Sequence, residues 1–428
     1  MHPGEIIYET IVRAAPAALR VVAPLSGKVR RGLAGRGETL PSMRTWAGAH
    51  RDPDRPLVWL HAPSVGEGLM AQAILEAIRE RAPHVQAAFT YFSPSAERIA
   101  PRTGADWYGY LPWDRTSDVR AALDALRPAC IAFVRTEIWP VLGREARDRG
   151  AHVLLVNAVL GEGSSRLRRG ARFLLGAAYR RLDAVGAVSQ DDAARFKRLG
   201  TPAGRVSVTG DARFDQVRDR VRGIDPQRPL LRRLREGGRP VLVAGSTWPA
   251  DEAHLVTALA ALAGQGSPWR LVAAPHEPTP AHVAGLARRL AQAGLSHAIL
   301  PVNDDDAMPA TDALIVDRVG ILAELYAAAH VAYVGGGFGG AGLHSVVEPA
   351  ALGVPVLYGP HHGNAREAGE LAVAGGGMVV GGGPTLRKAL AGLLDVDART
   401  GMGRAAREFV EARTGGASRN AELVIDRL

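Results

Sequence analysis

The segment PLVWLHAPSVGEGLMAQAILEAIRERA, residues 56–82, passes directly from an apolar run of strand length into a stretch with the apolar spacing of a helix. The same alternation continues to about residue 210. We predict strands at 57–62, 85–92, 129–134, 151–158, 183–189 and 205–210. Helices are predicted near 67–82, 117–127, 167–181 and 190–199. This alternation predicts a parallel sheet with helices on both faces.

A charged, proline-containing stretch without a predicted strand follows at 217–240 and indicates a domain boundary. A second alternating series begins directly after it. Its strands are predicted at 241–246, 269–275, 297–301, 313–317, 330–337 and 355–360, and its last helices near 385–395, 400–413 and 417–427. The sequence therefore predicts an α/β protein with two similar domains. Ligands of such sheets bind at the carboxyl ends of the strands.

Composition narrows the class of protein and of partner. The 428 residues are 47% hydrophobic and 22% charged, which describes a globular chain. The single cysteine, Cys130, lies in an apolar run, so an internal disulfide and a cysteine metal site are excluded, as suits a reducing compartment. A net charge of +9 favours an anionic partner. We expect no nucleic acid, because the charge is spread over many predicted helices and no recognition motif is present.

The N-terminal segment 5–25 is apolar but interrupted, and a basic stretch follows it. The interruptions are Arg13, Pro16, Arg20 and Pro24, and the basic residues are Lys28, Arg30, Arg31 and Arg36. Such interruptions argue against a bilayer-spanning helix, and the segment lacks the features of a secretory signal. It can lie in an anionic membrane surface or pack on its own domain as a helix. Composition does not decide between these interpretations.

Residues 337–342, GFGGAG, satisfy the dinucleotide-binding pattern after a predicted strand. The acidic residue that should stand at the end of the next strand, about 20 positions later, is missing, because after the predicted strand at 355–360 no carboxylate comes before Glu367. We therefore expect no nicotinamide or flavin. The glycines instead allow close approach of the backbone to a ligand, and a short helix at about 344–352 offers amide groups to an anion. Glu348 in that helix can bind sugar hydroxyls or be a solvated helix residue.

Two further strand ends carry polar side chains. Ser246 and Thr247 follow the strand at 241–246 and begin either a plain helix cap or a phosphate cradle. His276 follows the next strand and could contact the same anion. In the first domain, Ser64 and Glu67 satisfy the S-x-x-E capping box, so Glu67 is either a helix cap or a catalytic base.

Six stretches together carry a family resemblance. They are WLHAPSVGE (59–67), RTEIWP (135–140), VTGDARFD (208–215), GSTWPADE (245–252), APHEP (274–278) and residues 333–360. In this order they resemble the 3-deoxy-D-manno-octulosonic acid (Kdo) transferase family, glycosyltransferases of the GT-B fold. The resemblance implies two Rossmann-like domains whose parallel sheets face a central cleft.

The resemblance also implies a division of the chain. Residues 1–40 would associate with the membrane, 41–217 would form the acceptor-binding domain, and 218–239 would be a linker. Residues 240–428 would form the nucleotide-sugar domain together with the C-terminal helices. The enzyme would transfer Kdo from CMP-Kdo to the lipid A precursor, lipid IVA, with inversion. It would act at the cytoplasmic face of the inner membrane, without metal or cofactor.

Site residues follow from the matched stretches. Glu67 matches the family's catalytic base, a role that Gly66 supports because it lets another molecule approach the backbone. Donor binding is expected from Ser246, Thr247, His276, Gly337, Gly339, His344, Ser345 and Glu348. Ser64, Gly66 and Glu137 are expected to be acceptor-side or structural.

Some positions depart from the commoner family pattern. Arg135 replaces a glutamate, His276 stands in APHEP where PRHP is common, Ile321 replaces a glutamate, and Ser345 replaces an asparagine. These changes surround the donor site and leave Glu67 in place. Another GT-B transferase with a lipid-linked acceptor therefore stays an alternative. A noncatalytic sugar-binding or scaffold protein of this fold is a second alternative, against which the retained Glu67 argues.

Overall fold

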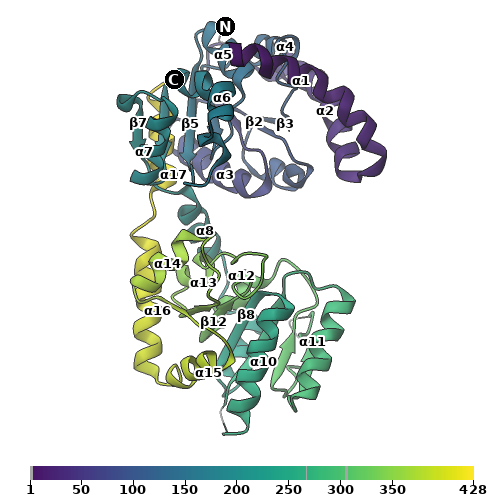
Figure 1. Ribbon diagram of the computed structural model, residues 1–428, viewed down its shortest axis with the longest axis vertical. Helices are drawn as coiled ribbons and strands as arrows, with labels where there is room; N and C mark the ends of the chain where they lie inside the picture. Colours follow the sequence, from purple (N-terminus) through teal and green to yellow (C-terminus); the bar gives the residue numbers. More distant parts are fainter. Residues whose placement is uncertain (1–2, 267, 304–306) are drawn as a thin grey trace. The chain divides into compact units, whose positions relative to one another are not determined.

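The computed structural model describes residues 3–266, 268–303 and 307–428 (Figure 1). The chain forms two compact units. The first contains the residues up to Gln216 together with Thr414–Leu428, and the second contains Val217–Arg413. Both units are α/β, as the sequence predicts.

The described part of the first unit contains a sheet of seven parallel strands in the order β3-β2-β1-β4-β5-β6-β7. The strands are β1 Leu57–His61, β2 Gln86–Tyr91, β3 Trp107–Tyr110, β4 Cys130–Val134, β5 His152–Ala158, β6 Ala184–Ala187 and β7 Val206–Val208. The strand β3 was not predicted. It is a four-residue strand at the edge of the sheet and leaves Tyr108 exposed, so it lacks the continuous apolar run of the central strands.

The helices of this unit cover both faces of its sheet. They are α1 Pro3–Val22, α2 Gly27–His50, α3 Val65–Arg81, α4 Thr116–Leu126, α5 Pro140–Asp148, α6 Arg169–Arg181, α7 Gln190–Leu199 and α17 Gly416–Ile425. The helix α8, Ala212–Arg222, begins in this unit and continues into the second unit from Val217. Alternate side chains of β1 enter two cores: Val58 and Leu60 pack on the side of α3, and Leu57 and Trp59 on the side of α4. Burial on both faces explains why β1 is apolar throughout.

In the second unit, the described residues form another sheet of seven parallel strands, in the order β10-β11-β9-β8-β12-β13-β14. The strands are β8 Val241–Thr247, β9 Arg270–Pro275, β10 His297–Ile299, β11 Ala313–Ile315, β12 Val331–Val334, β13 Val356–Tyr358 and β14 Gly377–Val379. The edge strand β14 has three residues and was also not predicted.

The helices of the second unit are α9 Pro229–Glu236, α10 Pro249–Ala263, α11 Pro280–Gln292, α12 Leu322–Ala327, α13 Val347–Ala351, α14 Arg366–Val373, α15 Gly383–Gly392 and α16 Val396–Glu411. The helix predicted at about 344–352 is α13, and it has five residues.

Three predicted boundaries differ from the structure. The boundary at 40/41 falls inside α2, which buries Met43. The predicted linker at 218–239 contains the end of α8 and all of α9, and α9 packs Leu230, Leu231 and Leu234 into the core of the second unit. The three leucines form an apolar face on α9, and for this reason the charged stretch folds as a helix of the second unit and is not a linker.

The third difference concerns α17, which the sequence analysis placed with the second domain. Figure 1 shows α17, in yellow, among the elements of the first unit. Asp215 accepts hydrogen bonds from the backbone N–H groups of Gly415 (2.6 Å) and Ala417 (2.9 Å). Asn420 Oδ1 accepts from the N–H of Asn157 at 2.8 Å, and Ala421 packs in the same core as α3. Part of the VTGDARFD stretch therefore holds α17 to the first unit.

Candidate active site

Glu67 lies in the first turn of α3, just beyond the carboxyl end of β1. Its side chain is half-buried, and the hydroxyl of Ser64 donates a hydrogen bond to its carboxylate. Ser64 is the N-cap residue, but among the described residues its side chain does not cap a backbone N–H group of α3. The reciprocal capping box, one of the two interpretations of S-x-x-E, is thus replaced by a contact between the Ser64 and Glu67 side chains. With this contact, the Glu67 carboxylate stays beside Ser64 at the start of α3.

The two glycines on either side of Glu67 differ in what surrounds them. Apart from its chain neighbours and the backbone of α3 itself, a Cβ atom at Gly66 would have no described heavy atom within 4 Å, and the residue does not have positive φ. A Cβ atom at Gly68 would lie 3.0 Å from Ile99 Cγ2. The packing of this unit therefore explains Gly68 and does not explain Gly66. The open space at Gly66 is compatible with close approach of another molecule.

Glu137 follows β4, in the loop before α5. Burial raises the pKa of its carboxyl, the charge of Arg166 opposes this, and the negative charge of Glu67 raises the pKa further. Glu67 and Glu137 are therefore near enough to interact electrostatically. The environment of Glu137 favours its protonated form.

His61, at the end of β1, is fully buried and was not singled out from the sequence. Its Nδ1 lies 3.0 Å from Thr90 Oγ1, and its ring packs edge-on against Phe133 and Trp139. Burial lowers the pKa of His61 to about 3, so the ring is neutral near pH 7. Within the described residues, His61 Nε2 and Trp139 Nε1 are buried without a hydrogen-bond partner. A ring so poorly basic is unsuited to be the general base.

Arg135, one of the departures from the family pattern, directly follows β4 and has a structural role there. Its φ is 77°, in the left-handed region. Its guanidinium lies 3.7 Å from the buried carboxylate of Asp211, which also pairs with Arg213 at 3.4 Å. Arginine at this position thus offsets the charge of a buried aspartate.

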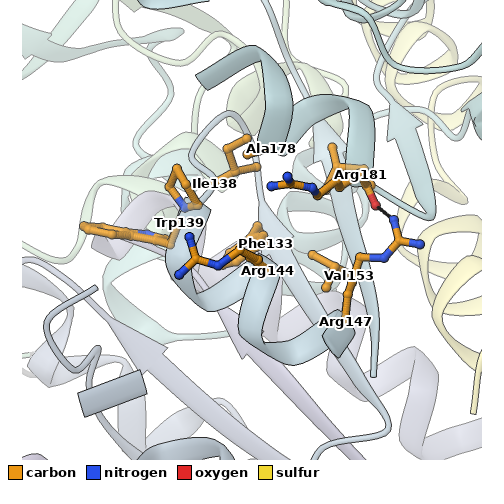
Figure 2. Close-up of a pocket in the computed structure, with 11 residues that line it drawn as sticks. Phe133, Ile138, Trp139, Arg144, Arg147, Val153, Ala178 and Arg181 are labelled. Atoms are coloured by element: carbon orange, nitrogen blue, oxygen red, sulfur yellow. Dashed lines mark hydrogen bonds between the residues drawn. The ribbon is translucent and has the colours of Figure 1, made fainter. Parts of the chain in front are cut away.

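A narrow pocket lies beside Trp139, beneath α5 and α6 (Figure 2). Arg144, Arg147 and Arg181 line it, and Arg147 donates a hydrogen bond to the main-chain carbonyl of Arg181. Its volume is about 10 Å³, which is room for roughly one water molecule. This pocket is too small for a sugar.

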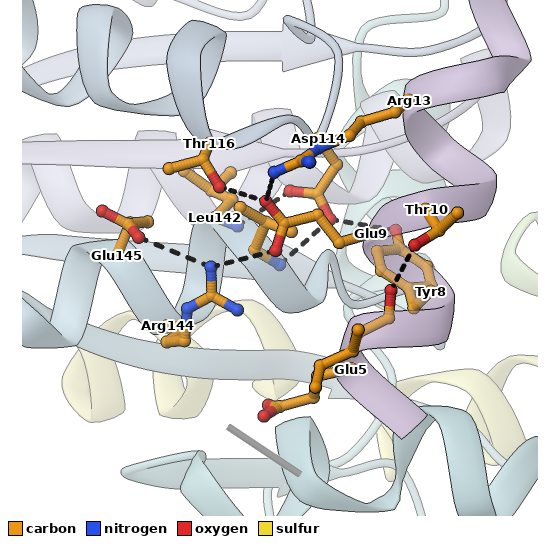
Figure 3. Close-up of polar contacts among 12 residues, drawn as sticks. Glu5, Tyr8, Glu9, Thr10, Arg13, Asp114, Thr116, Leu142, Arg144 and Glu145 are labelled. Carbon is orange, nitrogen blue, oxygen red and sulfur yellow. Dashed lines mark hydrogen bonds and ion pairs between the residues drawn. The ribbon is translucent and has the colours of Figure 1, made fainter. Parts of the chain in front are cut away.

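The helix α1 is attached to the first unit by a polar network (Figure 3). Tyr8 donates to Asp114 at 2.9 Å, and the Glu9 carboxylate contacts Thr116 and lies 3.6 Å from Arg144. Burial raises the pKa of Asp114 to about 6, although the N–H groups of Val141 and Leu142 donate to it. Packing on its own domain, one of the two interpretations that composition left open for this segment, is therefore observed for α1.

The same helix and the turn after it also expose apolar side chains. Leu25 is 87% exposed, Val21 78% and Ile11 56%. None of the described helices is both long and apolar enough to cross a bilayer. The docked face of α1 is thus held by polar contacts, and an apolar surface is left open.

In the second unit, three predicted donor-site positions come together at the carboxyl ends of β8 and β9. The His276 ring stacks on His344 at a centroid distance of 4.3 Å and on Trp248 at 5.0 Å. The N–H of His276 donates to the carbonyl of Thr247. Trp248 Nε1 donates to His344 Nε2 at 3.4 Å. Burial lowers the pKa of His344, its electrostatic interaction with the neighbouring His276 ring lowers it further, and the charge of Asp251 opposes both effects.

A buried aspartate holds this cluster to the glycine loop, and the sequence analysis did not predict that role. Asp251 accepts hydrogen bonds from the N–H of Trp248 (2.9 Å), the hydroxyl of Tyr333 (2.8 Å) and the N–H of Gly336 (2.9 Å). Ser246 has a φ of 53°. A Cβ atom at Gly335 would lie 2.3 Å from the carbonyl oxygen of Ser246, so the loop packs tightly on the end of β8.

The other predicted donor-site residues have mixed surroundings. A Cβ atom at Gly337 would lie 2.6 Å from the nitrogen of Gly359, so Gly337 serves the packing of this unit. At Gly339 the space is open apart from one backbone atom at 4.0 Å. Ser345 Oγ accepts a hydrogen bond from the N–H of Val347 at 3.4 Å. Glu348 pairs with Arg220 of α8 at 2.6 Å, a partner that the sequence analysis did not identify.

Across residues 3–266, 268–303 and 307–428, no group of three or more His, Cys, Asp or Glu side chains is arranged to hold a metal ion.

A sequence model of 3-deoxy-D-manno-octulosonic-acid transferase (kdotransferase) matches residues 38–216. The chain is 31% identical over 436 residues to the 3-deoxy-D-manno-octulosonic acid transferase of Bordetella pertussis, an alignment that covers 96% of this chain and 97% of the relative.

Two solved structures are similar in fold at low sequence identity. A putative UDP-N-acetylglucosamine 2-epimerase from Listeria monocytogenes has a TM-score of 0.59 at 13% identity, covering 86% of this chain and 94% of its own. MurG of Acinetobacter baumannii has a TM-score of 0.56 at 16% identity, covering 87% and 98%. These likenesses agree with the predicted GT-B fold.

Proposed function

The chain belongs to the 3-deoxy-D-manno-octulosonic acid transferase family and is a glycosyltransferase, and we propose that it transfers Kdo from CMP-Kdo to the lipid A precursor lipid IVA with inversion at the anomeric carbon. The alignment with the Bordetella pertussis relative over nearly the whole of both chains carries this proposal. The reaction as proposed uses no metal and no cofactor.

Glu67 is proposed to be the general base. A sugar hydroxyl is a weak nucleophile at neutral pH, and a positioned carboxylate that takes its proton contributes roughly 10²–10⁴-fold in rate. The hydroxyl oxygen then forms the bond to the anomeric carbon of Kdo while the bond to the CMP phosphate breaks. The proton passes to Glu67 and CMP leaves. The position of Glu67 at a helix start, its contact with Ser64 and the open space at Gly66 support this role.

The cluster of Trp248, His276 and His344 is proposed to bind the CMP-Kdo phosphate together with Ser246 and Thr247. Since His344 Nε2 accepts a hydrogen bond from Trp248, neutral His344 carries its proton on Nδ1 and keeps a donor for an anion. The fifteen-residue helix α10 begins directly after Trp248, and its N-terminal dipole favours negative charge. In this proposal Glu348 binds sugar hydroxyls, and Arg220 holds its carboxylate in place.

The protein is proposed to work at the cytoplasmic face of the inner membrane, as a peripheral or monotopic protein. The exposed apolar residues of α1 and the basic residues at the start of α2 support contact with an anionic lipid surface. No nucleic-acid partner is proposed.

One reconstitution tests the proposal. Purified protein, CMP-Kdo and lipid IVA in detergent should yield a glycolipid heavier by one or more Kdo units, measured by mass spectrometry. Glu67→Gln should reduce the rate by roughly 10²-fold or more without changing the unfolding temperature. The matched control is Glu76→Gln, an exposed glutamate on the same helix, which should retain activity. Absence of transfer by folded protein, or transfer from UDP-N-acetylglucosamine instead, would overturn the assignment.

A further inference from the structure

A recess of about 350 Å³ lies in the second unit, apart from the Trp248, His276 and His344 cluster. Its lining includes His330, which precedes β12, Gly353 in the turn before β13, and Arg399, Arg404 and Arg407 of α16. These positions put it at the amino ends of β12 and β13. The Trp248, His276 and His344 cluster lies at the carboxyl ends of strands of the same sheet. The recess and the cluster therefore lie at opposite ends of the strands of that sheet.

The recess is strongly basic and lacks compensating charge. None of its three arginines pairs with a carboxylate among the described residues, and no aspartate or glutamate lines it. Arg399 donates to the carbonyl oxygens of Leu393 and Leu394, and Arg407 donates to that of Leu352. Backbone carbonyls thus orient two guanidinium groups without neutralising them. Elsewhere in the described chain, many arginines form ion pairs, such as Arg413 with Glu370 and Arg239 with Asp312.

The glycines of the recess fix where these arginines lie. A Cβ atom at Gly403 would lie 2.2 Å from the carbonyl oxygen of Gly353, so α16 contacts this turn through backbone atoms. Gly353 has a φ of 73°, and a Cβ atom there would lie 2.8 Å from Arg407 Nη2. Both positions thus require glycine, and the fold brings the arginine face of α16 against the turn.

His330 adds a hydrogen-bond donor. Its Nδ1 accepts a hydrogen bond from the N–H of Val241 at 3.1 Å, so the neutral ring carries its proton on Nε2. Burial lowers the pKa of His330, and the positive charges of Arg399 and Arg235 lower it further. The arginines therefore create a positive field at the ring.

We propose that this recess is a second ligand site that binds the phosphate group of a small phosphorylated molecule. Guanidinium groups bind phosphate oxygens in pairs of parallel hydrogen bonds. Several guanidinium groups together suit a multiply charged anion such as phosphate better than they suit a carboxylate, which carries one charge. The volume lies within the usual range for small-molecule sites. The phosphate can belong to a soluble metabolite or to a lipid headgroup, which share this chemistry.

The first test is calorimetric titration of the full-length protein with sodium pyrophosphate. Saturating CMP is present to occupy the proposed donor site. We expect saturable binding that Arg404→Glu weakens roughly tenfold or more. Arg404 is exposed and has no side-chain hydrogen bond in the described structure, so the change should not disturb folding. The matched control is Arg387→Glu on α15, an exposed arginine of the same unit, which should bind as the unchanged protein does.

A second arm distinguishes the source of the phosphate. Binding to phosphatidylglycerol vesicles is measured for the same variants. If Arg404→Glu weakens vesicle binding and pyrophosphate does not bind, the ligand is a lipid headgroup. Equal behaviour of Arg404→Glu and Arg387→Glu with both probes would overturn the site. Arg404→Gln replaces Arg404→Glu if the latter lowers the unfolding temperature. None of these readouts requires transferase activity, so they separate this proposal from the proposed function.

Discussion

Gly66 and Gly68 flank the same carboxylate but meet different surroundings. The packing around Gly68 requires a small residue because Ile99 leaves no room, whereas nothing in the described unit requires one at Gly66. The sequence predicts the helix start and both candidate roles of Glu67. It could not separate these roles, since S-x-x-E has the same spacing whether Ser64 contacts the backbone or, as observed, the Glu67 side chain. That difference lies in side-chain rotamers.

The two glycines provide a paired prediction. Gly66→Ala should leave the free energy of unfolding unchanged or raise it by up to about 1 kcal/mol, and should lower kcat/KM by about tenfold or more if a substrate approaches there. Gly68→Ala should destabilise the protein by about 1–3 kcal/mol through overpacking against Ile99. Chemical denaturation and steady-state kinetics measure both effects. Full activity of Gly66→Ala would show that no ligand needs the space at this glycine.

At the scale of elements, sequence patterns predict the central strands well but miss one edge strand of each sheet, whereas the opposite edge strands β7 and β10 lie within predicted strands. Strands such as β1 and β4 are buried on both faces and therefore read as continuous apolar runs. The two missed edge strands, β3 and β14, are short and partly exposed and lack a continuous apolar run. The position of α17 was also beyond the sequence pattern, because its docking depends on contacts with Asp215 and Asn157, which lie about 200 residues or more away along the chain.

The helix α17 gives an element-scale prediction. Asp215→Asn should weaken the start of α17, because one of its two carboxylate acceptors becomes an amide donor that faces a backbone N–H group. We expect a loss of about 1–2 kcal/mol in stability and faster hydrogen exchange of the α17 amides. Asp395→Asn at the exposed N-cap of α16 is the matched control and should leave exchange in α17 unchanged. Unaltered exchange in Asp215→Asn would contradict this account of how α17 is held.

At the scale of the whole molecule, the net charge of +9 and the exposed apolar residues of α1 favour the same kind of partner. The sequence left two interpretations of the N-terminal segment open. The structure shows that α1 docks through polar residues, so the exposed apolar residues are not needed for that docking. Sequence periodicity could not reveal this, because the docking partners Asp114 and Arg144 lie more than 100 residues away in the chain.

Vesicle binding tests this surface. Ile11→Glu combined with Leu25→Glu should weaken binding to phosphatidylglycerol vesicles by roughly tenfold or more, because each buried aliphatic side chain contributes about 1.5–3 kcal/mol. Stability should change little, since both residues are exposed. Added salt should weaken the binding of the unchanged protein. Val373→Glu, at a 91% exposed position in the second unit, is the control. Equal binding by all variants would exclude α1 as the membrane contact.

The return of α17 to the first unit has a consequence for synthesis on the ribosome. The first unit's sheet is complete once β7 has emerged, but Ala417, Ala421 and Val424 of its core are translated only after the entire second unit. The nascent first unit must therefore wait with part of its apolar core uncovered while the second unit is made and folds. A ribosome that stops shortly before residue 414 would release a chain with a complete second unit and an aggregation-prone first one. Quality control should recognise such products by the surface that α17 normally covers.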